Sequence, residues 1–169
     1  MNSASRSDIS VWKFVLTYVV LMGIFLLAIS LKPVKEVLDI NGLYTELIVY
    51  LSGKALYPFG IVDGIQGSII HLKGVSLDVK FGCNGLEAFL IYTVAILAFP
   101  APLKKKLIGI SVGFIVLQVL NVGRIAGLGL SGIYLKEYFH YIHIYVAQGI
   151  MIVLALVTFL VWLNYAAEK

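Results

Sequence analysis

Residues 81–106 read FGCNGLEAFLIYTVAILAFPAPLKKK, and this stretch decides the fold of the chain. Its middle, about residues 84–99, is a mostly apolar run with one charged residue, Glu87, and such a run is typical of a membrane-spanning helix. Two prolines then end the helix, and three lysines, Lys104–Lys106, follow. Such a basic cluster indicates a cytoplasmic loop. The opposite end of the span, which carries Cys83, is therefore predicted to lie at the outer face.

The composition places the whole chain in a membrane. Of its 169 residues, 60% are hydrophobic and 13% are charged, and the mean hydropathy is +0.97. A soluble domain with this balance would expose large apolar patches. The net charge of +4 is small and its basic residues cluster at the ends of apolar runs, so we interpret them as topology markers and expect no nucleic-acid partner. A single cysteine excludes an intrachain disulfide.

Four apolar segments are predicted to span the bilayer, at about residues 11–31, 84–99, 107–130 and 143–163. Residues 1–10 form a polar N-terminal tail, and residues 11–169 form a single membrane-embedded domain. Basic residues before the first span and after the last predict that both termini are cytoplasmic. The predicted fold class is thus an all-α polytopic protein of the cytoplasmic (inner) membrane, with the lipid bilayer as its surroundings.

The segment between the first two spans, residues 32–82, is predicted to be extracytoplasmic. Residues 32–57 mix apolar and charged side chains over a length too short to span, which favours an amphipathic helix on the outer surface or a partly buried re-entrant piece. Residues 75–81 alternate between apolar and polar, and residues 68–72 precede them across a Lys-Gly pair, which predicts a small β-hairpin. Because lipid does not tolerate an open sheet edge, we expect the hairpin outside the membrane.

Three polar residues are predicted to meet at the outer end of the spans. With a helical rise of about 1.5 Å per residue, Cys83, Arg124 and His143 lie about 24, 26 and 29 Å from the cytoplasmic ends of their segments. The orientation of the spans follows from the lysine loop, and the three residues play no part in choosing it. A thiol, a guanidinium and an imidazole at one membrane face are the groups that cysteine-based acyl transfer requires.

Each of these side chains suits one step of that reaction. Cys83 stands at a helix N-terminus, where the partial positive charge favours an anionic nucleophile. Arg124 suits stabilisation of the oxyanion that forms when a peptide carbonyl is attacked. His143 suits protonation of the leaving amine and then activation of a second nucleophile.

Structural explanations compete with these chemical ones. A lone cysteine in a membrane protein usually only packs, an arginine near a helix end often reaches the lipid headgroups, and a histidine often lies at the interface. Asn84 and Asn121 are candidate orienting groups. Glu87 lies one turn from Cys83 on the same helical face, and it either orients Arg124 or His143 or holds the bundle together.

The remaining histidines and glycines have simpler interpretations. His140 and His143 have the helical spacing of two metal ligands, but no third ligand has a matching spacing, so no metal and no other cofactor is predicted. His71 is expected to be solvated in the hairpin. Six glycines in and after the third span are expected to be close-packing positions; they are Gly109, Gly113, Gly123, Gly127, Gly129 and Gly132.

Three motifs resemble the core of the exosortase/archaeosortase family over roughly residues 43–163: Cys83-Asn-Gly-Leu, Asn121-x-x-Arg124-Ile, and the later His143. Members of that family are polytopic membrane transpeptidases of bacteria and archaea. Their substrates are secreted, membrane-anchored proteins with a C-terminal sorting signal, made of a short motif, a transmembrane helix and a basic tail, as in the PEP-CTERM type. The resemblance implies that Cys83 is the nucleophile, Arg124 the transition-state stabiliser and His143 the acid/base.

The chain differs from many family members in two respects. It has fewer spans, which resembles compact subtypes such as exosortase H. Longer members often place a glycine a few residues after the histidine. Here the sequence reads His143-Ile-Tyr-Val-Ala-Gln-Gly149, and because of this difference both His140 and His143 stay candidates for the acid/base. His143 is preferred because it opens the last span and because His-x-Tyr-x-x-Gln resembles compact members.

The predicted function is a membrane cysteine transpeptidase with its active site facing the extracytoplasmic side. It would hold the cleaved substrate as a thioester on Cys83 and transfer it to an envelope or cell-surface acceptor. Two alternatives stay open. A plain cysteine endopeptidase, with water as the acceptor, would have the same site, and a non-catalytic membrane subunit of an envelope assembly system would function without the thiol. No sequence feature indicates the oligomeric state.

Overall fold

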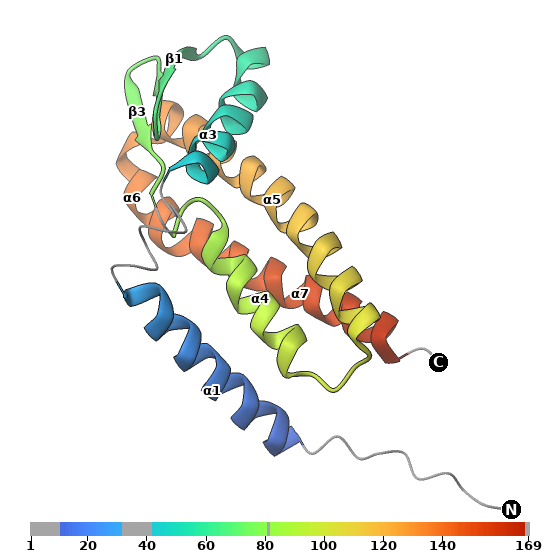
Figure 1. The fold of residues 1–169 in the computed structure, drawn as a ribbon. Helices are drawn as coiled ribbons and strands as arrows, with labels where there is room; N and C mark the ends of the chain where they lie inside the picture. The colour runs from blue at the N-terminus through green and yellow to red at the C-terminus, as the bar shows by residue number, and fades with distance from the viewer. Residues whose placement is uncertain (1–10, 32–41, 81, 168–169) are drawn as a thin grey trace, which may run out of the picture.

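The computed structural model describes residues 11–31, 42–80 and 82–167, and helices dominate this part of the chain (Figure 1). The longer helices are α1 (Val11–Ser30), α3 (Leu43–Leu56), α4 (Leu86–Ala98), α5 (Leu103–Tyr134) and α7 (Gln148–Ala167). Short helical turns are η1 (Tyr57–Phe59), η2 (Lys136–Tyr138), α6 (Phe139–Tyr141) and the π-helical η3 (Ile142–Ala147). The strands are β1 (Val62–Gln66), β2 (Ile69–Leu72) and β3 (Val75–Asp78).

Three helical stretches of the described chain are long and apolar enough to cross a membrane: Val11–Ala28, Leu103–Tyr134 and Lys136–Ala167. The chain is therefore a multi-pass membrane protein. The predicted second span is shorter than expected, because α4 has 13 residues and is about 20 Å long, against a hydrocarbon core of about 30 Å. A glycine-rich turn precedes α4 and two prolines follow it. The predicted count of four full spans is thus not confirmed.

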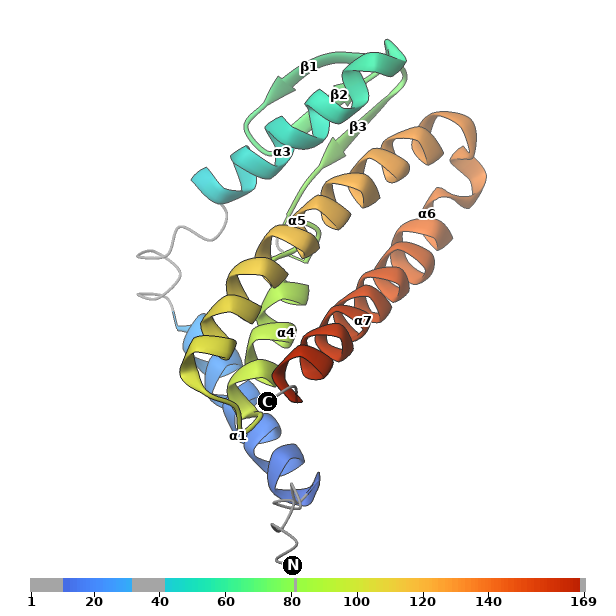
Figure 2. The ribbon, with the colours of Figure 1, turned by 90° about the vertical axis from the view of Figure 1, so that its right-hand side faces the viewer.

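The last two membrane segments are longer than predicted. α5 has 32 residues, about 48 Å, and begins at Leu103, so the three lysines lie in its first turns and not in a loop. The last segment begins at Lys136, ahead of the predicted start at residue 143. Both helices continue beyond the thickness of a bilayer core, and the far end of α5 packs against α3 and β3 (Figure 2).

The small sheet has three antiparallel strands in the order β1–β2–β3. β2 and β3 form the predicted hairpin, in which Leu72 pairs with Val75 across a turn where Gly74 has a φ of 86°. β1 was not predicted. It pairs with β2 through a register irregularity between Val62 and Gly64, and this glycine interrupts the alternation that would have indicated a strand.

Helix α3 accounts for the second half of the predicted amphipathic segment, whereas residues 32–41 lie outside the described residues. One face of α3 is buried against α5 and the sheet, so the helix is part of a packed unit. We call α3 and the three strands the cap. The cap and α5 share one apolar core, formed by Ile48, Val49, Leu56, Ile61, Ile70, Leu72, Val79 and Ile125.

A second apolar core lies at the opposite end of the bundle and joins α4, α5 and α7. A side chain at Gly109 would overlap Trp162, and one at Gly113 would overlap Tyr92, so these two glycines are the close-packing positions that were predicted. Tight neighbours also surround Gly129 and Gly132, whereas a side chain at Gly123 or Gly127 would meet nothing within 4 Å, and for those two the packing prediction was wrong.

The lysines at this end also bond the ends of neighbouring helices. Lys105 Nζ donates to the carbonyl oxygens of Tyr165 (3.3 Å) and Ala166 (3.2 Å) in the last turn of α7. Lys106 Nζ donates to the carbonyl of Leu97 (2.7 Å) near the end of α4. Cations are favourable there because helix C-termini carry partial negative charge.

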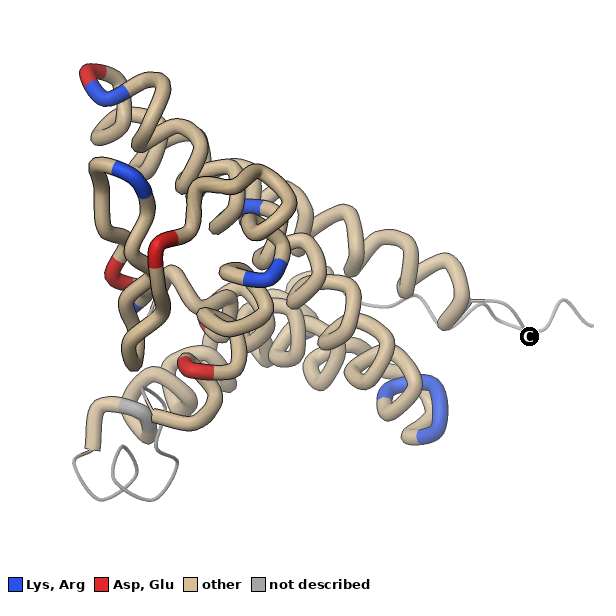
Figure 3. Tube along the Cα trace, turned by 90° about the horizontal axis from the view of Figure 1, so that it is seen from above, with Lys and Arg blue, Asp and Glu red and all other residues tan. Residues whose placement is uncertain are grey.

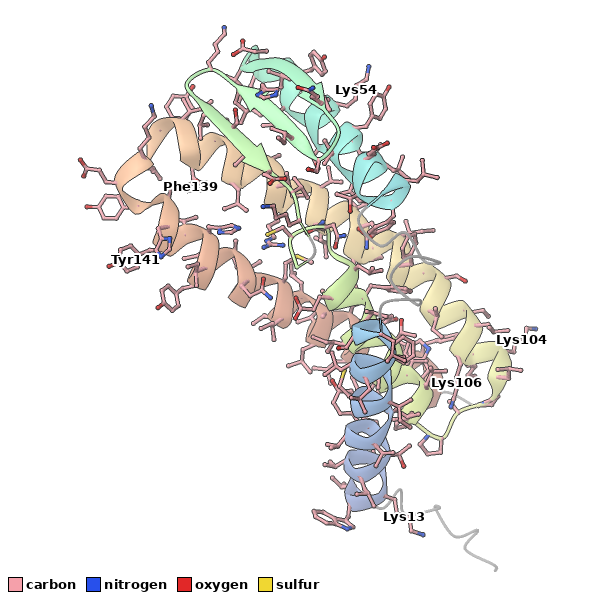
Figure 4. All side chains as sticks on the ribbon, turned by 60° about the vertical axis from the view of Figure 1, so that its left-hand side comes forward. Lys13, Lys54, Lys104, Lys106, Phe139 and Tyr141 are labelled. Atoms are coloured by element: carbon pink, nitrogen blue, oxygen red, sulfur yellow. The ribbon has the colours of Figure 1, made fainter. Side chains whose placement is uncertain are left out.

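Basic residues therefore mark one end of the bundle. Figure 3 shows the three consecutive lysines as one blue segment, with no acidic residue of the described chain beside it. Figure 4 shows Lys13, Lys104 and Lys106 at this end, and Lys54 on the cap at the other. The reaction centre that the sequence predicts lies between the two ends.

Candidate active site

Cys83 lies in a turn between β3 and α4, three residues before the helix begins. The backbone N–H groups of Cys83 and Asn84 both donate to the carbonyl oxygen of Lys80, at 2.8 and 3.1 Å. The flanking Gly82 and Gly85 have φ angles of 90° and 80°, a region that other residues rarely adopt. The two glycines of the Gly-Cys-Asn-Gly sequence thus allow a tight turn that holds the thiol at the N-terminal end of α4.

The middle of α5 brings Arg124 to this turn. Its Nη2 lies 3.9 Å from Cys83 Sγ, and its Nη1 donates to Asn121 Oδ1 at 3.3 Å. Asn121 is buried directly against Gly85, where an added Cβ would lie 2.8 Å from the amide carbon of Asn121. Gly85 therefore lets α5 approach the turn closely. Asn121, one of the two candidate orienting residues, accepts a hydrogen bond from Arg124.

The beginning of the last membrane segment supplies His143. Its Nε2 lies 3.3 Å from Cys83 Sγ. His143 belongs to the π-helical stretch η3, a conformation that is rare and often found at functional sites. The Phe139 ring stacks parallel to the imidazole, with centroids 5.9 Å apart, and this contact restricts the ring plane. His140 is exposed and its ring contacts Tyr141, so His143 is the histidine beside the thiol.

The structure thus brings Cys83, Arg124 and His143 together from three separate elements. The distance of 3.3 Å between sulfur and imidazole nitrogen allows direct proton transfer. The guanidinium of Arg124 faces the same sulfur. It can therefore stabilise negative charge that develops on the sulfur or on an atom beside the sulfur. The arrangement suits acyl transfer through the thiol. The catalytic role of each residue stays a prediction.

An apolar cavity of about 300 Å³ adjoins these residues between α1, α4 and α7. Glu87, Arg124 and Gln148 supply polar groups to its wall, and its apolar residues include Phe14, Ile91, Met151, Ile152, Leu156 and Phe159. Among the described residues Glu87 forms no ion pair with Arg124 or His143, so it lines the cavity and does not orient either partner through a salt bridge.

The other polar residues that were singled out lie apart from the thiol or show no metal site. His71 Nδ1 lies 3.0 Å from Ser76 Oγ on the exposed side of the hairpin. Within residues 11–31, 42–80 and 82–167, no group of three or more His, Cys, Asp or Glu side chains is placed to hold a metal ion, and His140 and His143 take part in none.

Two residues that contact the site were missed by the sequence analysis. The Tyr44 hydroxyl donates to the backbone carbonyl of Asn84 at 3.2 Å, and Asn84 Nδ2 donates to Thr45 Oγ1 at 3.1 Å. Both residues lie in the first turn of α3, about 40 positions before the turn they contact. No local pattern connects segments so far apart, and only the packing of the cap shows the contact.

This fold and site define a multi-pass membrane protein with a cysteine, a histidine and an arginine clustered at the N-terminal end of a short apolar helix. A family model described as transmembrane exosortase (Exosortase_EpsH) matches residues 9–163, and the chain belongs to this family. The family resemblance predicted from the three motifs is thereby confirmed.

The chain is also similar to Archaeosortase A of Natronomonas pharaonis. The two are 27% identical over 107 residues, which cover 56% of this chain and 34% of the relative. The matched region thus spans about a third of the length of that protein. No solved structure matches the chain significantly.

Proposed function

We propose that the chain is a membrane cysteine transpeptidase that cleaves the C-terminal sorting signal of secreted proteins. The observation that carries the proposal is the cluster around the sulfur, with His143 Nε2 at 3.3 Å and Arg124 Nη2 at 3.9 Å from Cys83 Sγ. Membership of the exosortase family supports a protein-sorting reaction. Arg124 Nε and Asn121 Nδ2 are buried donors without a partner among the described residues, and such groups are frequent at functional sites.

In the first half of the proposed reaction, Cys83 transfers its proton to His143 Nε2 and the sulfur attacks the carbonyl carbon of the scissile peptide bond. Negative charge moves to the carbonyl oxygen, where Arg124 stabilises it. The bond between carbon and nitrogen then breaks. The imidazolium of His143 gives its proton to the leaving amine, and the acyl group stays on Cys83 as a thioester.

In the second half, an incoming nucleophile gives its proton to His143 and attacks the thioester. Collapse of the second tetrahedral intermediate releases the sulfur, which recovers the proton from His143. An acceptor of the envelope or cell surface makes this step a transpeptidation. Water makes it a hydrolysis, and the site geometry is the same for both.

The experiment that tests the function is capture of the thioester. Membranes that contain the chain and a secreted protein ending in a short motif, an apolar helix and a basic tail are quenched in acid and digested. We expect the peptide with Cys83 to carry the new C-terminus of the substrate, and hydroxylamine to release it. Product masses then separate transpeptidation, which leaves an added acceptor, from hydrolysis, which leaves a free carboxylate. Cleavage without any adduct on Cys83 would contradict the proposal.

We also propose that the lysine-rich end is cytoplasmic and that the cap and the reaction centre face the outside of the inner membrane. Lys54 and Lys104 are exposed at opposite ends of the molecule, so they form a matched pair of reporters (Figure 4). In a Cys83→Ala background, Lys54→Cys should react with a membrane-impermeant maleimide in intact spheroplasts. Lys104→Cys should react only after permeabilisation, because basic clusters at the ends of membrane helices stay in the cytoplasm. The opposite labelling pattern would refute this orientation.

A further inference from the structure

The residue that follows the thiol is held by the cap. Asn84 has 0% of its surface exposed. Its Nδ2 donates to Thr45 Oγ1 at 3.1 Å, its Oδ1 accepts from the backbone N–H of Leu86 at 3.1 Å, and its carbonyl oxygen accepts from the Tyr44 hydroxyl at 3.2 Å. Asn84 is thus hydrogen-bonded once to the start of α4, through its side chain, and twice to α3, through its side chain and its backbone carbonyl.

The α3 end of this contact is itself buried. Thr45 is 1% exposed, and α3 packs through Ile48, Val49 and Leu56 into the core that it shares with the sheet and α5. Polar groups buried at this depth are costly to leave unpaired, because they can no longer bond water. The bonds between α3 and Asn84 are therefore a fixed attachment of the turn to the cap.

The turn needs such an attachment, because glycines stand on both sides of the Cys83–Asn84 pair. Gly82 and Gly85 adopt φ angles of 90° and 80°, and glycine has the widest choice of alternative backbone conformations. Proton transfer and nucleophilic attack depend on distances held to about half an ångström. A turn fixed only by its own backbone bonds would not hold the sulfur at 3.3 Å from His143.

We propose that Thr45 and Tyr44 of α3 are positioning residues that act through Asn84 to hold the Cys83 thiol against His143. The inference rests on the proposed role of Cys83 as the nucleophile. On this proposal the cap has a function in the reaction, because α3 sets the position of the reacting sulfur.

The test uses the pH dependence of alkylation, since Cys83 is the only cysteine of the chain and a small neutral reagent such as iodoacetamide reports on it alone. The shape of the rate–pH profile, unlike its height, does not depend on how accessible the thiol is. His143 Nε2 lies where it can accept the thiol proton, so loss of this partner should lower the alkylation rate at pH 7 relative to the rate at high pH. We expect Thr45→Val to lower this ratio of rates by about tenfold, toward the ratio of His143→Ala.

Conservative and matched variants decide between positioning and general loosening. Thr45→Ser keeps the hydroxyl and should restore the wild-type profile, and Tyr44→Phe should shift it in the same direction as Thr45→Val. Thr93→Val is the control, because the Thr93 hydroxyl is buried in α4 and has no partner among the described residues. Thermal unfolding in detergent identifies any variant that has lost its fold.

The proposal is overturned if Thr45→Val keeps the wild-type profile while His143→Ala changes it, or if Thr93→Val shifts the profile as much as Thr45→Val. Alkylation needs no substrate, so this result is independent of the proposed function. If Cys83→Ala still supported cleavage, the function would fail while the profiles would still report on the positioning of the turn.

Discussion

Replacement of Cys83 by alanine should abolish cleavage of the sorting signal, with a fall in turnover of about a millionfold, the scale seen when an acyl-transfer enzyme loses its nucleophile. The chain has no second cysteine to substitute. Glu87 and Arg124, which line the adjoining cavity, carry no thiol and so cannot hold the substrate as a thioester. The accumulation of uncleaved substrate in membranes, measured by immunoblotting and mass spectrometry, checks the result.

Two control variants test whether the loss of cleavage is specific to the thiol. Cys83→Ser places a hydroxyl near His143 in place of the thiol, and because a hydroxyl is a far weaker nucleophile, cleavage should also be lost. Thr93→Val changes a buried polar residue of α4 away from the sulfur and should process normally. Both chains must reach the membrane in wild-type amounts. Normal processing by Cys83→Ala would favour the alternative of a non-catalytic assembly subunit.

Replacement of His143 by alanine should lower the rate of cleavage by about 10²- to 10⁴-fold, the usual contribution of a general acid–base residue. The imidazole is the group at hydrogen-bond distance from the sulfur, and without it both the thiol and the leaving amine lack a proton partner. Residual activity of the variant should rise with pH, because hydroxide can remove the thiol proton that the imidazole no longer accepts. Initial rates in membranes between pH 6 and pH 9 measure both effects.

His140→Ala is the matched control, because it removes the same side chain three positions earlier from an exposed site. Its rate should stay within about twofold of wild type, as is usual for surface positions away from the reacting atoms. An equal loss in both variants would mean that the geometry around the sulfur does not identify the acid/base. A loss in His140→Ala alone would assign that role to His140.

The common depth of Cys83, Arg124 and His143 could be predicted because helical rise is constant and the lysine cluster indicates the orientation of the spans. Their lateral contact could not be derived from depth alone, since it depends on which faces of α4, α5 and η3 meet. The π-helical conformation of η3 has no recognised sequence signal, and it influences where the imidazole points.

Other features were hidden for different physical reasons. β1 contains Gly64, which breaks the alternation by which strands are recognised. The bond between Thr45 and Asn84 joins residues 39 positions apart, and neither residue belongs to a periodic pattern. The apolar run of residues 84–99 indicated a full span, but the turn at Gly82–Gly85 and the prolines after α4 leave a helix of 13 residues.

The short length of α4 has a consequence for how substrates arrive. A helix of about 20 Å falls about 10 Å short of the thickness of the hydrocarbon core, so a thiol at its mouth lies below the level of the lipid headgroups when the proline end reaches the opposite boundary. Soluble peptides would have to leave water to reach it, whereas a polypeptide already inserted in the bilayer arrives by lateral diffusion. Under the proposed function, the anchoring of a substrate, independent of its sequence, would be a first filter against cleavage of passing secreted chains.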